Sequence, residues 1–172
     1  MREASAIVEE LVLTELDKVN WTAINTILLG EAAAFFSDLV ARYPDRSSDI
    51  LKTHVANGSA ILAIDYLDAK AAQEARRSAF PAETKGYDAV LTLPAFGEAP
   101  HGLQSTGDAA YCAPWTLLGA PAVTLPAGFG PNGLPLGIQL VGRYREDLHV
   151  LRVAKWVETA LAFDPGIPKI MS

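Results

Sequence analysis

The feature that most constrains the fold of this chain is a strand–loop–strand pattern between residues 108 and 142. Residues 122–125 form a short apolar run between Pro121 and Pro126, which predicts a buried strand that stops at each proline. Glycine, proline and asparagine crowd residues 128–133, and this composition predicts a turn. Apolar and small residues then alternate over residues 134–141, which predicts a second strand.

The second predicted strand carries a glycine in its interior. Leu136, Ile138 and Leu140 share one face of this strand, and Gly137 and Gln139 share the other. Glycine weakens a strand, so Gly137 predicts a bulge or a close approach by another backbone. The approaching group is either a packed neighbour in a buried strand pair or a bound ligand, and the pattern leaves both open.

A long helix is predicted ahead of the strands, over about residues 21–42. Asn20 is suited to cap its N-terminus. Gly30 lies inside the helix at a cost of about 1 kcal/mol relative to alanine, so it marks a close packing contact or a bend. Apolar residues recur at helical spacing on one stripe, namely Trp21, Ile24, Leu28, Phe35 and Leu39.

Two more helices are predicted before the strands. The first begins at a cap, Ser47 or Ser48, and ends at Gly58, with Ile50, Leu51, His54 and Val55 on one face. The next spans about residues 61–80 and is closed by Pro81. Its inward face is predicted to hold Ile64, Leu67, Ala71 and Ala75.

The remaining segments complete the order of elements. Residues 87–92 predict a short strand, and residues 94–107 predict a loop without periodicity. Residues 148–163 predict a last helix, ended by the residues 164–166, with Val150, Ala154, Val157 and Leu161 on its apolar stripe. Residues 1–19 fit a short helix or an edge strand. Helices followed by strands and a final helix indicate an α/β or α+β fold.

Composition excludes several classes of partner. The net charge of −6 argues against nucleic acid, because binding phosphates needs clustered Lys and Arg. No apolar run reaches about 18 residues, so we expect no membrane contact. The acidic N-terminus does not fit a secretory signal. Cys112 is the single cysteine; it excludes an internal disulfide and is consistent with a cytoplasmic location, where we expect it to be a small core residue.

Candidate catalytic groups are sparse. None of the serines lies in a Gly-x-Ser-x-Gly nucleophile elbow. Ser105 lies in the loop sequence QSTGD, which either binds a polar group or caps the following helix through Thr106 or Asp108. The three histidines, His54, His101 and His149, show no metal-binding spacing, so we expect no metal.

No nucleotide cofactor is indicated either. Residues 128–130, Gly-Phe-Gly, superficially match a phosphate loop. They lead into a predicted strand, whereas dinucleotide and phosphate loops lead into a helix N-terminus. From the residues alone, the chain offers a packed scaffold with one suggestive loop, and we expect no cofactor.

Four stretches together resemble one known family: residues 87–94 (YDAVLTLP), 105–108 (STGD), 115–128 (WTLLGAPAVTLPAG) and 133–142 (GLPLGIQLVG). They are similar to the C-terminal portion of the amidase signature enzymes, and the resemblance covers roughly residues 20–162. It implies a partial amidase-signature-like fold of the α/β class, with helices packed on a small mixed sheet. The implied organisation is a lead-in segment over 1–19, the amidase-like portion over 20–163 and a tail over 164–172.

The chain does not match the part of the family that carries the catalytic residues. Members of the family hydrolyse amides, or transfer ammonia from them, with a serine, a second serine preceded by a cis peptide bond, and a lysine. These groups lie in the family's N-terminal half, and no stretch here matches it, so no catalytic residue is assigned.

The substrate-binding residues that the resemblance implies are Asp108 and Trp115. In amidotransferases related to this family, an aspartate about ten residues before the Gly-x-Pro step contacts the substrate's amino group, and Asp108 precedes Gly119 by eleven positions. The alternative for Asp108 is a helix cap, and the alternative for Trp115 is a core aromatic.

Two functions follow from the resemblance. In the first, the chain is the C-terminal part of an amidase-like hydrolase, inactive alone, that meets a small-molecule amide when joined to its N-terminal half. In the second, it is a non-catalytic binding or oligomerisation module, for which exposed sheet edges and apolar faces predict a homo-oligomer. A hydrolase built on Ser105 is a third and weaker possibility.

Overall fold

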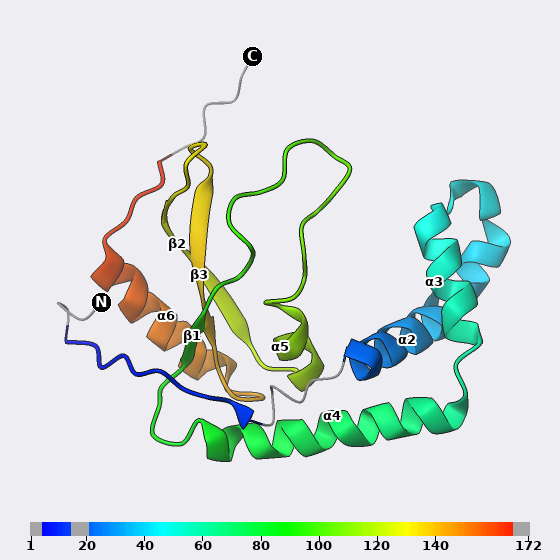
Figure 1. Cartoon of the computed structure of the whole chain (residues 1–172), viewed down its shortest axis with the longest axis horizontal. Helices are drawn as coiled ribbons and strands as arrows, with labels where there is room; N and C mark the ends of the chain where they lie inside the picture. The colour runs from blue at the N-terminus through cyan, green and yellow to red at the C-terminus, as the bar shows by residue number, and fades with distance from the viewer. Residues whose placement is uncertain (1–4, 15–20, 167–172) are drawn as a thin grey trace. The chain divides into compact units, whose positions relative to one another are not determined.

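The computed structural model describes residues 5–14 and 21–166, and Figure 1 shows the order of the elements. The chain divides into two compact units. One spans Thr14–Ala79, and the other joins the residues up to Leu13 to those from Phe80 onward. Each unit is built around its own internal contacts.

The first unit is helical. It contains α2 (Trp21–Arg42), a short 3-10 turn η2 (Pro44–Arg46), α3 (Asp49–Ser59) and most of α4 (Ala63–Glu83). The predicted bounds of the first helix are confirmed. Ser48 caps α3, because its hydroxyl oxygen accepts a hydrogen bond from the Leu51 amide at 3.2 Å.

Two glycines set how closely the helices of this unit approach. A Cβ atom at Gly58 would overlap the carbonyl oxygen of Leu29 and lie 2.8 Å from the Cβ of Ala33. Gly58 therefore permits the contact between α2 and α3, and the prediction that it ends the helix was wrong, since Ala60 is the C-cap. A Cβ at Gly30 would lie 3.2 Å from the Tyr66 ring, which confirms the predicted close packing.

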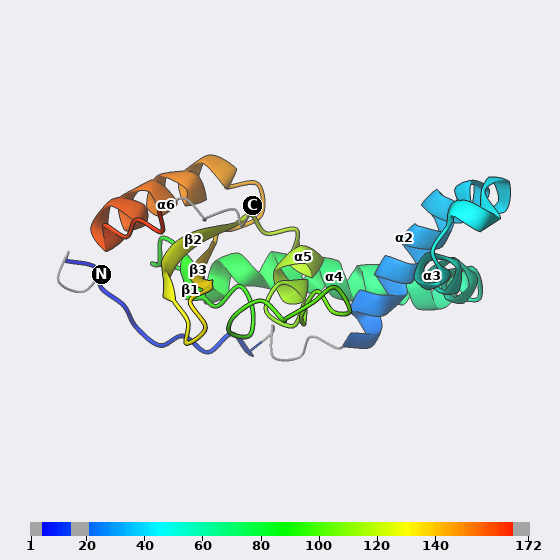
Figure 2. The same ribbon diagram turned by 90° about the horizontal axis from the view of Figure 1, so that it is seen from above.

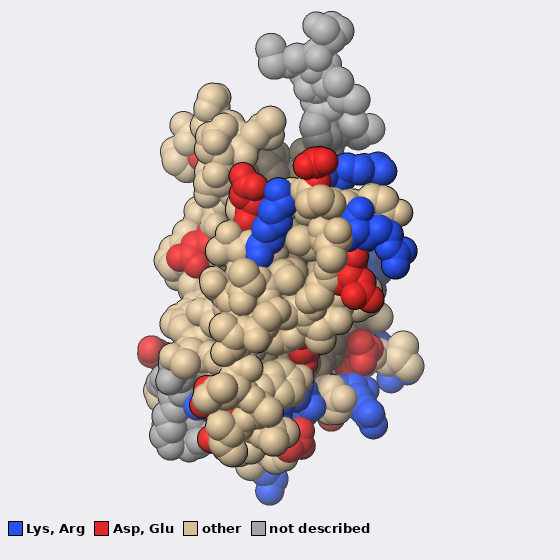
Figure 3. Space-filling model, turned by 90° about the vertical axis from the view of Figure 1, so that its right-hand side faces the viewer, with Lys and Arg blue, Asp and Glu red and all other residues tan. Residues whose placement is uncertain are grey.

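The apolar faces predicted for these helices are largely exposed. On α4 the predicted inward residues are uncovered, with Ile64 at 59% and Leu67 at 61% exposure, whereas Ala69 and Gln73 are buried. The stripe on α2 is also open, since Trp21, Leu28, Phe35 and Leu39 are 46–78% exposed. Figure 3, which faces α2 and α3, shows a broad uncharged surface with charged side chains mainly around it.

The end of α4 also differs from the prediction. The helix continues past Pro81 to Glu83. Pro81 therefore lies in the last turn of α4, where its missing N–H and its ring affect only the end of the helix. The amide and the hydroxyl of Thr84 both donate to the carbonyl of Phe80, at 3.0 and 2.8 Å.

Helix α2 is long and apolar enough to cross a membrane by length and composition. The same composition suits the core helix of a soluble protein. Glu31, in the middle of α2, accepts a hydrogen bond from the Tyr66 hydroxyl at 3.0 Å and lies 3.6 Å from the Lys70 ammonium. The absence of a membrane partner stays a prediction.

The second unit holds a three-stranded sheet in the order β1-β3-β2. The strands are β1 (Val90–Thr92), β2 (Ala122–Phe129) and β3 (Pro135–Val141). Both pairings are antiparallel, with Val141 of β3 opposite Val90 and Ala122. Helices packed on a small sheet are thus confirmed, although the described strands are antiparallel where a mixed sheet was expected. The first strand is also shorter than predicted.

The strand pair predicted over residues 122–141 is confirmed, with one correction. Strand β2 runs through Pro126 to Phe129, because Pro126 lies opposite Gly137 next to a register shift between Pro126 and Gly128. The predicted close approach at Gly137 is confirmed, since a Cβ there would lie 2.7 Å from the Thr124 methyl group. That neighbour is part of the paired strand, so packing explains this glycine.

Helix α6 (Asp147–Leu161) covers one face of the sheet, as Figure 2 shows. Its predicted stripe is confirmed, because Val150, Ala154 and Val157 are buried against Leu125 and Leu140. The helix ends earlier than predicted, at a C-cap on Ala162 in the left-handed conformation with φ of 48°.

On the opposite face of the sheet lies α5 (Ala113–Leu118), with the loop that precedes it. Residues 5–13 form neither a helix nor a strand, and residues 1–4 and 15–19 of the predicted lead-in lie outside the described residues. The same holds for Asn20, the predicted cap, and for residues 167–172 of the tail.

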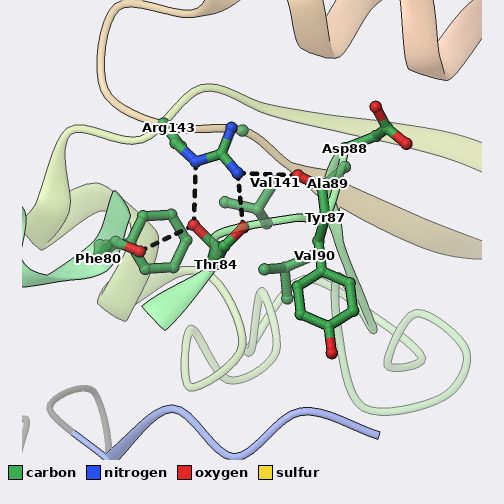
Figure 4. A pocket seen from close by; sticks show the side chains of 9 residues that line it. Phe80, Thr84, Tyr87, Asp88, Ala89, Val90, Val141 and Arg143 are labelled. Atoms are coloured by element: carbon green, nitrogen blue, oxygen red, sulfur yellow. Dashed lines mark hydrogen bonds between the residues drawn. The ribbon is translucent and has the colours of Figure 1, made fainter. Parts of the chain in front are cut away.

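Arg143 joins three segments of the second unit. Its Nε donates to the hydroxyl of Thr84 at 3.1 Å, and one terminal nitrogen donates to the carbonyls of Thr84 and Tyr87 at 2.6 and 2.8 Å. The other terminal nitrogen donates to Glu146 at 3.3 Å. Figure 4 shows the guanidinium above Thr84 and Tyr87. A guanidinium presents five donors in a fixed fork, so it suits this position better than an ammonium does.

We expect Gly58→Ala to lower the free energy of unfolding by about 2 kcal/mol or more, because the added methyl group overlaps the backbone of α2. Gly30→Ala is the matched control and should change stability by less than about 1 kcal/mol, because the gain in helix propensity offsets a mild contact. Urea unfolding followed by circular dichroism measures both. Equal effects would contradict the role of Gly58.

We expect Arg143→Met to lower the free energy of unfolding by about 3 kcal/mol, because the partly buried carbonyls of Thr84 and Tyr87 lose a charged donor. Arg143→Lys should lose less, since an ammonium still reaches one acceptor. Arg145→Met removes the same charge from an exposed position and should cost little. If Arg143→Met were as stable as Arg145→Met in urea unfolding, the hydrogen bonds of Arg143 would contribute nothing to the free energy of unfolding.

Candidate functional site

The loop over residues 93–112 is anchored where it reaches α5. The thiol of Cys112 donates to the carbonyl of Pro94 at 3.1 Å and lies 3.8 Å from the side-chain oxygen of Gln139. The Gln139 amide donates to the carbonyl of Tyr111 at 3.3 Å, and this glutamine is buried in the middle of β3. Cys112 is half-buried and makes these hydrogen-bonding contacts, whereas its apolar neighbours had predicted a small core residue.

Asp108 and Ser105 lie in the exposed part of this loop. One carboxylate oxygen of Asp108 accepts from the Ala110 amide at 2.9 Å, and the Ser105 hydroxyl accepts from the Gly107 amide at 3.1 Å. Both are local turns. The alternative that Thr106 or Asp108 caps α5 was wrong, because the N-cap is Cys112 and no side chain bonds there.

Trp115 is in a different environment. It lies on α5, is only 6% exposed, and its ring centroid is 6.0 Å from that of Phe80. Its indole N–H has no acceptor among the described residues. Buried indole N–H groups usually find a partner, so this donor is the one polar feature of an otherwise apolar contact. Substrate binding by Asp108 and Trp115 stays a prediction, with Asp108 at the surface and Trp115 in the core.

Glu98 fixes the far end of the loop, and no sequence pattern predicted its role. Its carboxylate accepts from the backbone amides of Asn132 and Leu134 at 2.9–3.1 Å and from the Asn132 side chain at 2.6 Å. These groups belong to the turn between β2 and β3. A Cβ at Gly130 would overlap the Glu98 side chain, so that glycine makes room for the contact. A single acidic residue in a loop gives no periodic signal that would have revealed this.

The hydrogen bonds determine the ionisation of Glu98. Partial desolvation acts to raise its pKa, but the bonds from the Leu134 amide and from the side chain and backbone of Asn132 together outweigh it. The pKa of Glu98 is therefore lowered. The carboxylate stays charged under neutral conditions and keeps all its acceptor sites for the hairpin.

No acyl-transfer machinery is assembled within the described ranges. Ser37, Ser47 and Ser59 donate to backbone carbonyls one helical turn earlier. Several lysines pair with acids, as Lys155 does with Glu158 at 2.8 Å. No described contact joins a serine to a lysine, and over residues 5–14 and 21–166 no three His, Cys, Asp or Glu side chains gather to hold a metal ion.

The comparisons with known proteins define the family. The family model for Amidase matches residues 2–151, so this chain belongs to the amidase family, and its resemblance to the amidase signature enzymes is confirmed. A curated relative from Protochlamydia amoebophila, the A component of its glutamyl-tRNA(Gln) amidotransferase, is 33% identical over 132 residues. That match covers 70% of this chain and 27% of the relative.

Solved structures agree on the fold. A crystal structure of an amidase superposes with a TM-score of 0.78 at 29% identity, covering 92% of this chain and 39% of that one. A 6-aminohexanoate cyclic dimer hydrolase shares the fold with a TM-score of 0.71 at 18% identity, covering 91% of this chain and 38% of that one. The chain thus spans well under half the length of these relatives.

The predicted domain boundaries stay predictions. The family match begins at residue 2, inside the segment set apart as a lead-in.

We expect the amides of Asn132 and Leu134 to report the titration of Glu98. Because the folded pKa is lowered, the stabilisation from this carboxylate is present at neutral pH and is lost as the pH falls through the folded pKa. In ¹H–¹⁵N spectra recorded over falling pH, both amide signals should shift together, with a midpoint below the usual 4.5. Glu98→Gln should abolish this shift. A midpoint at or above 4.5 would contradict the arrangement.

Proposed function

We propose that this chain supplies the C-terminal part of an amidase-family hydrolase that acts on the carbon–nitrogen bond of a small-molecule amide. One observation carries the proposal. The family model matches residues 2–151, while the described residues hold no serine paired with a lysine and the chain spans 27–39% of its relatives. The reactive groups then come from a portion of the domain that this chain does not span, and the chain is inactive by itself. A cytoplasmic location is part of the same proposal.

In this proposal the chain contributes scaffold and one wall of the substrate pocket. Asp108 is suited to the wall because it lies at the surface and uses one carboxylate oxygen for its own turn. Its second oxygen has no hydrogen bond among the described residues and is free to accept one from a substrate amino or amide group. Trp115 supports the wall from below through its packing on Phe80.

A non-catalytic binding or oligomerisation module is the alternative function. The observation that favours it is the amount of exposed apolar surface, including Leu28 at 56% and Phe35 at 78% on α2. Surfaces of this kind mark interaction sites. In this alternative the surfaces meet a second copy of the chain, whereas in the first function they meet the rest of an amidase domain.

We expect the purified chain to release no ammonia from simple aliphatic and aromatic amides, because residues 5–14 and 21–166 assemble no activated nucleophile. When it is mixed with the N-terminal portion of a related amidase, ammonia release should appear. In that mixture Asp108→Asn should raise KM about tenfold or more, as expected for the loss of a charged hydrogen bond. Asp45→Asn, an exposed change on η2, is the control.

Two outcomes would overturn this function. Amide hydrolysis by the chain alone would show that it holds its own catalytic groups. A stable homodimer in light scattering that neither binds the added portion nor gains activity would favour the oligomerisation module.

A further inference from the structure

Two aromatic side chains contact each other on the loop over residues 93–112, which also carries Asp108. The ring centroids of Phe96 and Tyr111 are 4.5 Å apart, and the planes of the two rings are inclined by 50°. Aromatic rings attract each other at this separation and tilt. Figure 1 shows the loop leaving the end of β1 and returning to α5. We call Phe96 and Tyr111 the loop aromatic pair.

The backbone on each side of Phe96 is held by a hydrogen bond. Two residues before it, the carbonyl of Pro94 accepts from the thiol of Cys112 at 3.1 Å. Two residues after it, the carboxylate of Glu98 accepts from backbone amides of the turn between β2 and β3 at 2.9–3.1 Å. The position of the Phe96 side chain is therefore set by the fold of the loop, and little ordering is needed when the ring meets another molecule.

Tyr111 is fixed from the sheet side. Its carbonyl accepts from the side-chain amide of Gln139 at 3.3 Å, and Gln139 is only 3% exposed in β3. Tyr111 itself is half-buried. Because the two members of the loop aromatic pair are held independently, Tyr111 supports the Phe96 ring from a fixed position.

The Phe96 ring is more exposed than its contact with Tyr111 would leave a packed side chain. It is 58% exposed, although a phenylalanine gains much of its free energy of transfer only when it is buried. The hydrogen bonds at Pro94 and Glu98 fix the loop without help from this ring. Phe96 therefore offers an open aromatic surface, in a defined place, to a group outside the described residues.

We propose that Phe96, supported by Tyr111, is a specificity-determining residue, and that it selects amides that carry an aromatic ring. The inference rests on the proposed function, in which this loop forms one wall of the substrate pocket. Asp108, three residues before Tyr111, then accepts a hydrogen bond from the polar end of the substrate, and the Phe96 ring contacts its aromatic end. The substrate class is an aromatic carboxamide, of which benzamide is the simplest member.

An aromatic substrate fits Phe96 better than an aliphatic one of the same size. Both gain from burial of apolar surface, but two aromatic rings also attract each other through their quadrupoles. That additional attraction corresponds to about a two- to tenfold gain in affinity. The expected preference is therefore for a planar ring at constant size, and benzamide and cyclohexanecarboxamide form the matched pair of substrates that measures it.

The test uses the full chain mixed with the N-terminal portion of the amidase that is 29% identical to it. Ammonia release from each substrate gives kcat/KM, and the ratio of benzamide to cyclohexanecarboxamide is compared between variants. Phe96→Leu keeps an apolar side chain and removes the ring. We expect it to lower this ratio by about fivefold or more, mainly through a higher KM for benzamide. The added portion is the same in every mixture, so a change in the ratio reports on this chain.

Two further variants are the controls. Phe96→Tyr retains an aromatic ring and should keep the ratio within about twofold of the unsubstituted chain. Phe129→Leu makes the same change in another aromatic contact, since Phe129 is 52% exposed and its ring centroid lies 5.4 Å from that of Phe163. It lies outside the loop over residues 93–112 and should also leave the ratio within about twofold. Circular dichroism checks that each variant is folded.

The outcomes separate this inference from the proposed function. An active mixture in which Phe96→Leu changes both substrates equally, or changes neither, would overturn the role of Phe96 and leave the function standing. An equal fall of the ratio in Phe129→Leu would also overturn it, because the effect would then not belong to the loop aromatic pair. A mixture without activity on any amide would overturn the function and this inference together.

Discussion

The antiparallel pairing of β2 with β3 is the interaction on which the rest of the second unit depends. It aligns Leu125 and Leu140 to receive Val150, Ala154 and Val157 of α6 on one face. On the other face it presents Gln139, whose amide holds the turn that leads into α5. The pairing runs past Pro126 by means of a register shift between Pro126 and Gly128. Beside that shift lies Gly137, where the Thr124 methyl group leaves no room for a side chain. Alternation along β3 therefore creates both the core and the support for the loop that carries Asp108.

The sequence predicted the helices and strands that have a regular spacing of apolar residues along their whole length. The bounds of α2, the extent of β3 and the buried stripe of α6 all follow from apolar spacing. The errors have physical causes. Apolar spacing on α4 shows which residues share a face, but it does not show whether this chain covers that face, and Ile64 is exposed. Proline is tolerated near the end of an element or beside a bulge, and Pro81 lies in the last turn of α4 while Pro126 lies next to a register shift.

The candidate site was less predictable than the fold. The resemblance pointed to Asp108 and Trp115, and the structure places them at the surface and in the core respectively. Glu98 and Arg143 were not predicted, because each acts through hydrogen bonds to backbone groups that are distant in sequence. Such contacts depend on where loops meet, and no spacing rule along the chain encodes that. The sequence shows that position 143 is an arginine, but it does not show that the carbonyls of Thr84 and Tyr87 accept its hydrogen bonds.

The exposed apolar residues and the anchored loop have a common explanation if the chain completes a larger domain. A loop that carries part of a substrate pocket must hold its shape before the other part arrives, since disorder at that point would weaken binding. The loop here is fixed at one end by four hydrogen bonds to Glu98 and at the other by Cys112 and Gln139. Apolar faces such as that of α2 are in contrast left open, and in the proposed function their burial contributes to the free energy of association. Rigid polar anchors and uncovered apolar faces are together what a partial domain needs in order to meet its remainder in one orientation.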